Sequence, residues 1–290
     1  MPLTSDIVFK RVFAKEENKD LLKDILEAIL KVKIESIEIK NPEIPQNLTD
    51  SKAGTLDIKV EINENTVIDV EMQVENEYNI DDRSTRYLIS MSEDELKKGE
   101  DYSTIRKVIT INLLNFNYFK RNSFFNIAHM KFEKNTKDTY INMGYSEEDE
   151  IATEKLEMVY IELPKFKKKS SSQNNALNQW LWLIIGEEEK IKMASKENIK
   201  IKKAVDIIEE MSADPKEWER YRSRQMAIMN YNAGINNAQE RGRQEGKQEG
   251  KKEGRKEEKL RIAKKMKSKS MSIKEIEELT GVTKEEIVKL

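Results

Sequence analysis

Two short segments that alternate between polar and apolar residues constrain the fold of this chain more than any other feature. They span residues 57–60 and 67–73. Alternation with a period of two is typical of a β-strand with one buried face. The residues between them, 63–65, are Asn, Glu and Asn and have the composition of a hairpin turn. We therefore predict an antiparallel hairpin with one polar face.

Acidic side chains lie on the polar faces of both predicted strands. Asp57 is on the first strand, and Glu71 shares its face of the second strand with Asp69, which we interpret as an exposed strand residue. Facing side chains lie about 5 Å apart at Cβ and like charges repel, so a divalent cation would stabilise the pair. Asp57 and Glu71 share a side of the sheet only if odd-numbered residues pair with odd-numbered residues. This condition predicts a three-residue connection near Asn63–Thr66, or a bulge.

Further segments, taken together with the hairpin, resemble one family of nucleases. These segments are Asp6-Ile7-Val8-Phe9-Lys10-Arg11-Val12-Phe13, Leu56-Asp57, Val70-Glu71-Met72-Gln73, Arg83 to Tyr87, Gly99 to Tyr102, the Gly-Lys/Arg-x-Glu run at 242–254, and Ile276 to Val282. In order and spacing they are similar to the Rpn family of recombination-promoting nucleases and transposases, within the PD-(D/E)xK nuclease superfamily. The resemblance covers nearly the whole chain.

This resemblance implies an α/β fold: a restriction-endonuclease-like core with a mixed central sheet flanked by helices, followed by an all-helical C-terminal region. It implies a metal-dependent DNA endonuclease linked to DNA recombination or mobile-element activity, with DNA as the partner. The catalytic residues would be Asp57, Glu71 and Gln73. The metal ligands would be Asp57, Glu71 and the backbone carbonyl of Met72. The ion would be Mg²⁺ or another divalent cation such as Mn²⁺ or Ca²⁺, and Asp6 would line the same cleft.

The chain departs from the superfamily pattern at two positions. Gln73 stands where Lys is usual, and Leu56 stands where Pro is usual. Because Gln cannot supply a cation to the phosphate, a catalytically impaired, DNA-associating accessory protein of a mobile element is an alternative. A scaffold held by its helical tail is a third hypothesis, and it predicts no binding of divalent metal. A plain hairpin with one solvated face would also produce the strand pattern.

Composition excludes several kinds of chemistry. The chain has no Cys and a single His, so thiolate catalysis and His-cluster zinc sites are excluded. We expect a cytoplasmic protein without a membrane span, because no apolar run approaches about 20 residues and the N-terminus does not resemble a signal peptide. The net charge of −2 leaves phosphate contacts to local basic patches, at 165–169, 200–203 and 220–224. Each patch taken alone also fits an ordinary solvated surface.

The periodicity of apolar residues predicts the remaining elements. Helices are expected at 4–14, 21–30 and 81–98 and from about residue 174 onward, and strands at 108–114, 122–134 and 156–163. We divide the chain into a nuclease core at 1–170, a helical extension at 171–238 that packs on the core, a Gly/charged tether at 239–259, and a small helix-turn-helix-like module at 260–290.

The tether and the module are distinct in composition. Gly recurs every four residues from Gly242 to Gly254, and each Gly costs a helix about 1 kcal/mol, which favours a semi-flexible tether. Interleaved Glu residues argue against DNA contacts there. In the module, Ser272 and Thr283 each precede a Glu by three residues, which is the form of a capping box. We interpret the module as an interaction or dimerisation element that supports a homodimer, in preference to a reader of DNA bases.

Overall fold

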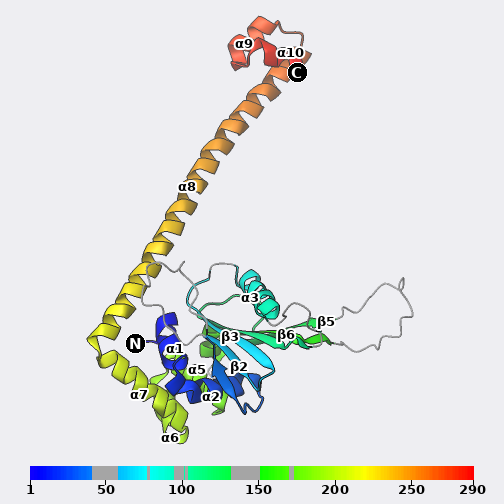
Figure 1. Ribbon diagram of the computed structural model, residues 1–290. Helices are drawn as coiled ribbons and strands as arrows, with labels where there is room; N and C mark the ends of the chain where they lie inside the picture. The colour runs from blue at the N-terminus through cyan, green and yellow to red at the C-terminus, as the bar shows by residue number, and fades with distance from the viewer. Residues whose placement is uncertain (41–57, 77–78, 95–100, 102–103, 132–150, 170–172) are drawn as a thin grey trace. The chain divides into compact units, whose positions relative to one another are not determined.

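A six-stranded mixed sheet forms the centre of the N-terminal part of the chain (Figure 1). The computed structural model describes residues 1–40, 58–76, 79–94, 101, 104–131, 151–169 and 173–290. The strands are β1 (Ile37–Ile39), β2 (Ile58–Ile62), β3 (Thr66–Gln73), β4 (Lys107–Leu114), β5 (Phe125–Lys131) and β6 (Ile151–Glu162). Their order in the sheet is β1-β2-β3-β4-β6-β5. The central strands β3, β4 and β6 are parallel, and the outer pairings are antiparallel.

The predicted hairpin is formed by β2 and β3. Lys59 pairs with Asp69 and Ile62 pairs with Thr66, which leaves residues 63–65 as a three-residue connection. Asn63, which begins the connection, has a φ of 49°, in the left-handed region that Asn tolerates better than most residues. The predicted connection and the pairing of odd-numbered with odd-numbered residues are both confirmed.

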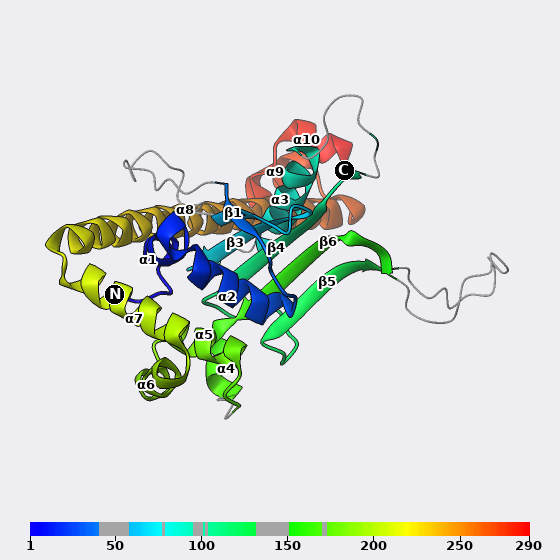
Figure 2. The same ribbon diagram turned by 60° about the horizontal axis from the view of Figure 1, so that its bottom comes forward.

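Most of the helices pack against one face of the sheet, as Figures 1 and 2 show. They include α1 (Asp6–Phe13), α2 (Lys19–Leu30), α5 (Ala176–Ile185) and α7 (Ile199–Ala213), with the short elements η1 (Glu16–Asn18), α4 (Leu163–Lys169) and α6 (Glu188–Glu197) between or beside them. Leu, Ile and Trp side chains recur at helical spacing, and they form the apolar side of this layer that packs against the sheet. Trp180 of α5 is fully buried, and the even-numbered residues Ile68, Val70 and Met72 of β3 join the same core.

A single helix, α3 (Ile80–Asp94), covers the other face of β3 and β4 (Figure 1). Its Leu88 and Met91 pack against Val67 of β3 and Val108 of β4. The central position of β4 agrees with the continuous apolar run in its sequence, since a strand covered on both faces needs apolar residues on both. The polar residues of β3 therefore face a helix and not open solvent.

The described chain forms two compact units, Met1–Gln225 and Met226–Leu290. Helix α8 (Pro215–Ser268) begins in the first unit and includes residues 239–259, for which we expected a tether. Helices α9 (Ile273–Thr280) and α10 (Lys284–Lys289) follow, each opened by the predicted capping box. The mixed sheet with flanking helices and the helical C-terminal region confirm the expected fold class, whereas the domain limits stay predictions. Within the described residues, no helix has the length and apolarity that a membrane crossing requires.

Candidate functional site

Three polar side chains lie buried along the odd-numbered face of β3. Asp69, Glu71 and Gln73 are 4%, 2% and 7% exposed. Our expectation that Asp69 would be an exposed strand residue was wrong. Its strand is flanked by β2 and β4 within the sheet, and α3 lies over this face. Burying two carboxylates two residues apart on one strand costs free energy unless something compensates their charge.

Asp69 is the side chain for which this burial is most unfavourable. Burial raises the pKa of the Asp69 carboxyl well above its usual range, and the neighbouring charge of Glu71 raises it further. Among the contacts of the described residues, Asp69 Oδ2 has no hydrogen-bond partner. A buried carboxylate oxygen without a donor is a free-energy cost that a bound cation would remove.

Gln73 and Arg83 hold the Glu71 carboxylate between them. The side-chain amide of Gln73 donates a hydrogen bond to Glu71 Oε2. On the other side, Arg83 Nη2 of α3 lies 3.6 Å from Glu71 Oε1. Gln73 therefore contacts the proposed metal ligand directly, as an orienting group for that carboxylate.

Cations from three different elements act on the Asp69 carboxylate. Lys59 lies directly opposite Asp69 in the β2–β3 register, and together with Arg83 of α3 and Lys10 of α1 it favours the charged form of Asp69. Lys10 is only 4% exposed. The site thus gathers positive charge although Gln73 replaces the usual Lys.

Sequence reasoning did not assign Lys10 or Lys59 to the site. Lys59 could have been found, because the odd-with-odd pairing that we required of the hairpin places it on the face of Glu71. Lys10 carried a weaker signal: it is a charged residue between the buried residues Phe9 and Val12 of a short apolar helix. The approach of α1 to β3 is a tertiary contact that no local pattern reports.

A hydrogen bond between α3 and β4 positions Arg83. In the sheet, Glu71 pairs with Asn112, which in turn pairs with Tyr160. Ser84, the residue after Arg83, donates from Oγ to Asn112 Oδ1 at 3.1 Å, and all atoms of Ser84 are buried. This bond anchors the first turns of α3 over the row that contains Glu71, so the neighbouring Arg83 can reach the carboxylate.

Asp6, which the resemblance placed at the same cleft, is engaged elsewhere. Its Oδ2 accepts a hydrogen bond from Arg224 Nε at 2.8 Å, and its Oδ1 accepts one from the Ile7 backbone N–H at 2.7 Å. Arg224 is 3% exposed. It therefore does not belong to a surface patch at 220–224, because a buried, paired guanidinium is not available to a phosphate.

The other two residues predicted to bind metal can be compared with the structure only in part. Asp57 lies outside the described residues. The Met72 side chain packs into the core on the opposite face of the sheet, which leaves only its backbone carbonyl for a ligand. The described residues contain no group of three or more acidic or His side chains arranged to hold a metal ion. Two buried carboxylates, one with an unpartnered oxygen, nevertheless fit a hard divalent cation.

A comparison with protein families bears on this site. The family model described as PD-(D/E)XK nuclease family transposase matches residues 3–238. The chain belongs to this family. The matched range contains the hairpin, α3 and the whole of α1. No curated protein and no solved structure matches the chain.

Membership of the PD-(D/E)XK nuclease family transposases supports a nuclease- or transposase-like role. PD-(D/E)XK nucleases generally use divalent metal ions, and they act on nucleic acid. In this member, the polar face of β3 presents carboxylates and an amide at the spacing Asp69-x-Glu71-x-Gln73. The positive charge near them comes from Lys10, Lys59 and Arg83.

Proposed function

We propose that this protein is a metal-dependent DNA endonuclease that hydrolyses phosphodiester bonds, in the service of DNA recombination or mobile-element activity. The observation that supports it best is the buried Asp69–Glu71 pair on one face of β3, with Arg83 Nη2 3.6 Å from Glu71 and with Lys59 opposite Asp69 in the sheet. A fold that needed only a stable sheet would place apolar residues here, since burying like charges is unfavourable.

The proposed ligands of the metal ion are Glu71, Asp57 and the backbone carbonyl of Met72. A bound Mg²⁺, or another divalent cation such as Mn²⁺ or Ca²⁺, would activate water and neutralise charge on the phosphoryl group. Gln73 orients the Glu71 carboxylate through its amide. Asp69 adds a further carboxylate on the same face, whose repulsion with Glu71 favours binding of a cation.

The positive charge that Gln73 cannot supply comes from Lys10, Lys59 and Arg83. Arg83 Nη2 lies 3.6 Å from Glu71 Oε1. A guanidinium binds phosphate oxygens in a bidentate manner, which suits the stabilisation of a phosphoryl group. We therefore assign phosphate contacts to Arg83 and general electrostatic stabilisation to the two lysines.

Incubation of the purified protein with supercoiled plasmid, with and without Mg²⁺, tests this function. We expect nicking that requires the metal and that is abolished by Asp57→Ala, by Glu71→Ala and by the near-isosteric Glu71→Gln. Glu64→Gln is the matched control, because Glu64 is an exposed Glu in the hairpin connection. Full activity of a folded Asp57 or Glu71 variant, at matched circular dichroism, would remove the site.

The absence of any metal-dependent nicking by the wild type, together with retained DNA binding, would favour the accessory protein of a mobile element. That alternative rests on Gln73, the position at which the chain departs from the superfamily. We further propose a cytoplasmic protein that pairs with a second copy through its terminal helices. Leu279 and Val288 support this pairing, because they are 65% and 57% exposed on a module with a very small core.

A further inference from the structure

Positive charge is concentrated in the C-terminal unit of this slightly acidic chain. Residues 226–290 contain sixteen Lys and Arg against eleven Glu, whereas residues 1–225 contain thirty-six Lys and Arg against forty-three Asp and Glu. Within the C-terminal unit, residues 241–269 hold thirteen of the basic side chains and only five Glu. A protein of net charge −2 that binds nucleic acid needs such a local excess.

The helical conformation of α8 separates the two signs of charge. Basic residues recur every four positions, and we call them the basic stripe: Arg243, Lys247, Lys251, Arg255 and Lys259. Glu245, Glu249 and Glu253 lie two positions away from their basic neighbours. Residues two apart are about 200° apart around an α-helix, which places them on opposite sides. Each interleaved Glu, although it argued against DNA contacts in the sequence, therefore faces away from its two nearest stripe residues, while the stripe turns by about 40° around the helix at each step.

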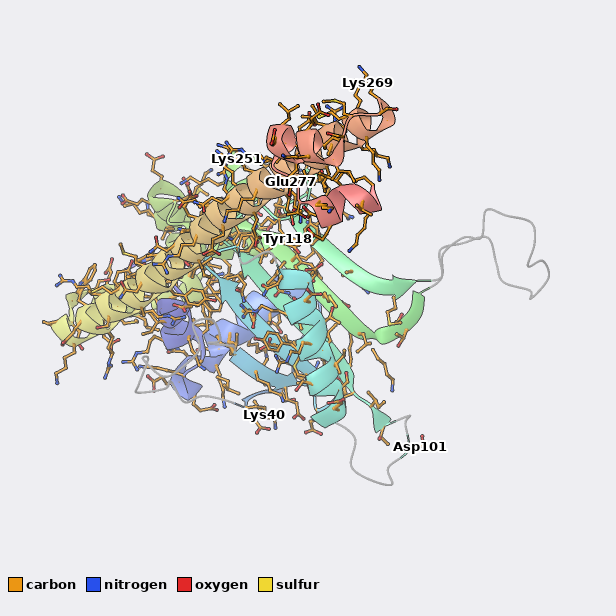
Figure 3. The ribbon with its side chains drawn as sticks, turned by 90° about the horizontal axis from the view of Figure 1, so that it is seen from above. Lys40, Asp101, Tyr118, Lys251, Lys269 and Glu277 are labelled. Atoms are coloured by element: carbon orange, nitrogen blue, oxygen red, sulfur yellow. The ribbon has the colours of Figure 1, made fainter. Side chains whose placement is uncertain are left out.

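The basic stripe is exposed, and within the described parts of the chain its members have no acidic partner. The whole of 239–259 is solvent-exposed. In the described part of the unit, Glu258 pairs with Arg261 and Glu286 pairs with Lys256. None of the five stripe residues forms an ion pair among the described residues. Lys251 is marked on the exposed surface of α8 in Figure 3.

A groove within the C-terminal unit continues the stripe at its C-terminal end. The groove has a volume of about 1120 Å³, and its lining includes Lys251, Arg255 and Lys259 of α8 together with Glu258 and Glu286. Gly281, in the turn between α9 and α10, lines its other side with a φ of +68°. Lys259 Nζ lies 3.4 Å from the position that a Cβ on Gly281 would take, so the end of the Lys259 side chain lies against this turn.

We propose that the basic stripe of α8 binds the phosphate backbone of double-stranded DNA without reading its sequence. This inference rests on the proposed function, for which it supplies the DNA-holding surface. Successive stripe residues are about 6 Å apart along the helix, and the stripe spans about 24 Å. One DNA strand carries a phosphate about every 3.4 Å of its axis, so the stripe can contact several phosphates.

The same segment does not fit the other common partners of basic helices. From 239 to 259 there is no apolar residue, whereas a helix that lies on a membrane needs an apolar face. A protein interface of any strength needs buried anchors such as Trp or Tyr, and this segment has none. The partner that fits this segment is a polyanion of complementary charge, and such binding does not depend on the nucleotide sequence.

The salt dependence of DNA binding tests the proposal in the full-length protein. We would measure the affinity for a fluorescent duplex by anisotropy between 50 and 200 mM salt, about the range over which phosphate contacts weaken strongly, in EDTA to prevent cleavage. The variant carries Arg243→Gln, Lys247→Gln, Lys251→Gln and Arg255→Gln, and Gln keeps helix propensity close to that of Lys and Arg. Each lost phosphate contact should reduce the slope of log K against log salt by about 0.9, so we expect a reduction of about 3 to 4.

The matched control removes the same number of charges from the first unit. It carries Lys33→Gln, Lys120→Gln, Lys192→Gln and Lys196→Gln, all at exposed positions outside the basic patches at 165–169, 200–203 and 220–224. A reduced slope in the stripe variant with an unchanged slope in the control supports the proposal. Equal slopes in the stripe variant and the wild type overturn it, as does an equal loss in the control. Binding of anionic vesicles with the same sensitivity to the stripe substitutions would also overturn it.

The proposal and the nuclease function can fail separately. If Glu71→Gln abolishes nicking but the stripe variant keeps the wild-type slope, the nuclease site stands and the stripe does not bind DNA. If the stripe variant loses slope while Glu71→Gln still nicks plasmid, the DNA-holding surface stands and the assigned site is wrong.

Discussion

At the scale of single residues, Asp69 is an acidic side chain in an environment that disfavours its charged form. It is buried beside Glu71, and one of its oxygens lacks a hydrogen-bond partner among the described residues. Such unfavourable groups concentrate at sites where a ligand or a reaction compensates them. The nearby Lys59 and Arg83 lower the pKa of Asp69 but do not cancel the effect of burial.

We predict that Asp69→Asn stabilises the metal-free protein. Asn keeps the shape of the side chain but carries no charge, so it avoids the cost of burying a carboxylate beside Glu71, the same burial and charge that raise the pKa of Asp69. An uncompensated buried polar group costs about 1 to 3 kcal/mol, and a charged one costs more, so the free energy of unfolding at pH 7 should rise by about 1 kcal/mol or more. Thermal unfolding in EDTA measures it. Asp82→Asn, at an exposed position of α3, should change stability by less than about 0.5 kcal/mol. A destabilised Asp69→Asn protein would contradict this account of the site.

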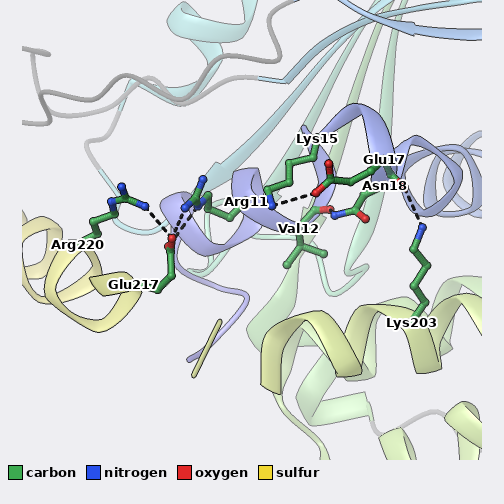
Figure 4. A network of polar contacts seen from close by, with 8 residues as sticks. All are labelled: Arg11, Val12, Lys15, Glu17, Asn18, Lys203, Glu217 and Arg220. Atoms are coloured by element: carbon green, nitrogen blue, oxygen red, sulfur yellow. Dashed lines mark hydrogen bonds and ion pairs between the residues drawn. The ribbon is translucent and has the colours of Figure 1, made fainter. Parts of the chain in front are cut away.

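At the scale of elements, the first turns of α8 clamp α1 against the first unit. Glu217 of α8 accepts hydrogen bonds from Arg11 of α1, and Arg220 also donates to it at 2.7 Å (Figure 4). One turn further along α8, Arg224 pairs with Asp6 at the other end of α1. Because α1 also carries Lys10, this clamp helps to hold a cation near Asp69.

We predict that Glu217→Gln weakens this clamp in a pH-dependent way. Burial alone would raise the pKa of Glu217, but the hydrogen bond and charge of Arg11, with Arg220, lower it below its usual value. A lowered folded-state pKa stabilises the protein above the unfolded pKa of about 4.3, and this stability is lost as the pH falls through the folded value. The variant should lose about 1 to 3 kcal/mol at pH 7.

Thermal unfolding of the wild type and the variant from pH 3 to pH 7 measures this effect. The difference between them should shrink as the pH falls from the unfolded pKa of about 4.3 through the lowered folded-state pKa of Glu217, below which both proteins are neutral at this position. Glu219→Gln is the control, since Glu219 is an exposed residue of the same helical turn. A difference that stays constant over the whole pH range would show that packing, and not charge, makes the contribution of Glu217.

At the scale of the whole molecule, the first unit has an excess of acidic residues and the second unit has an excess of basic residues. The first unit holds the candidate site, and the second holds the basic stripe and a small core of Ala263, Ile276, Val282 and Ile287. A core of this size rarely stabilises a domain without a partner. The second unit therefore has two features that favour a partner: the basic stripe, which favours a polyanion, and the small core, which favours apolar contacts with another protein surface.

We predict that truncation after Ala238 preserves the nicking activity but lowers the affinity for DNA. The cut leaves residues 1–225, the first compact unit, intact. Nicking at low salt should persist, while DNA affinity at 150 mM salt should fall by at least about tenfold, because the truncated protein lacks the stripe. Light scattering would report whether the mass in solution also falls, as expected if the terminal module pairs with a second copy. Unchanged mass together with unchanged salt-dependent binding would mean that the tail has neither role.

The sequence by itself determined the features that arise from local periodicity and local hydrogen bonds. Strict alternation predicted β2 and β3, and the need for Asp57 and Glu71 to share a face predicted the three-residue connection. Ser272 and Thr283, each three residues before a Glu, predicted both capping boxes. Only the tertiary structure decided what covers the polar face of β3. Burial of Asp69 under α3, and the approach of Lys10 from α1, depend on contacts between segments distant in the sequence, and no short-range pattern encodes them.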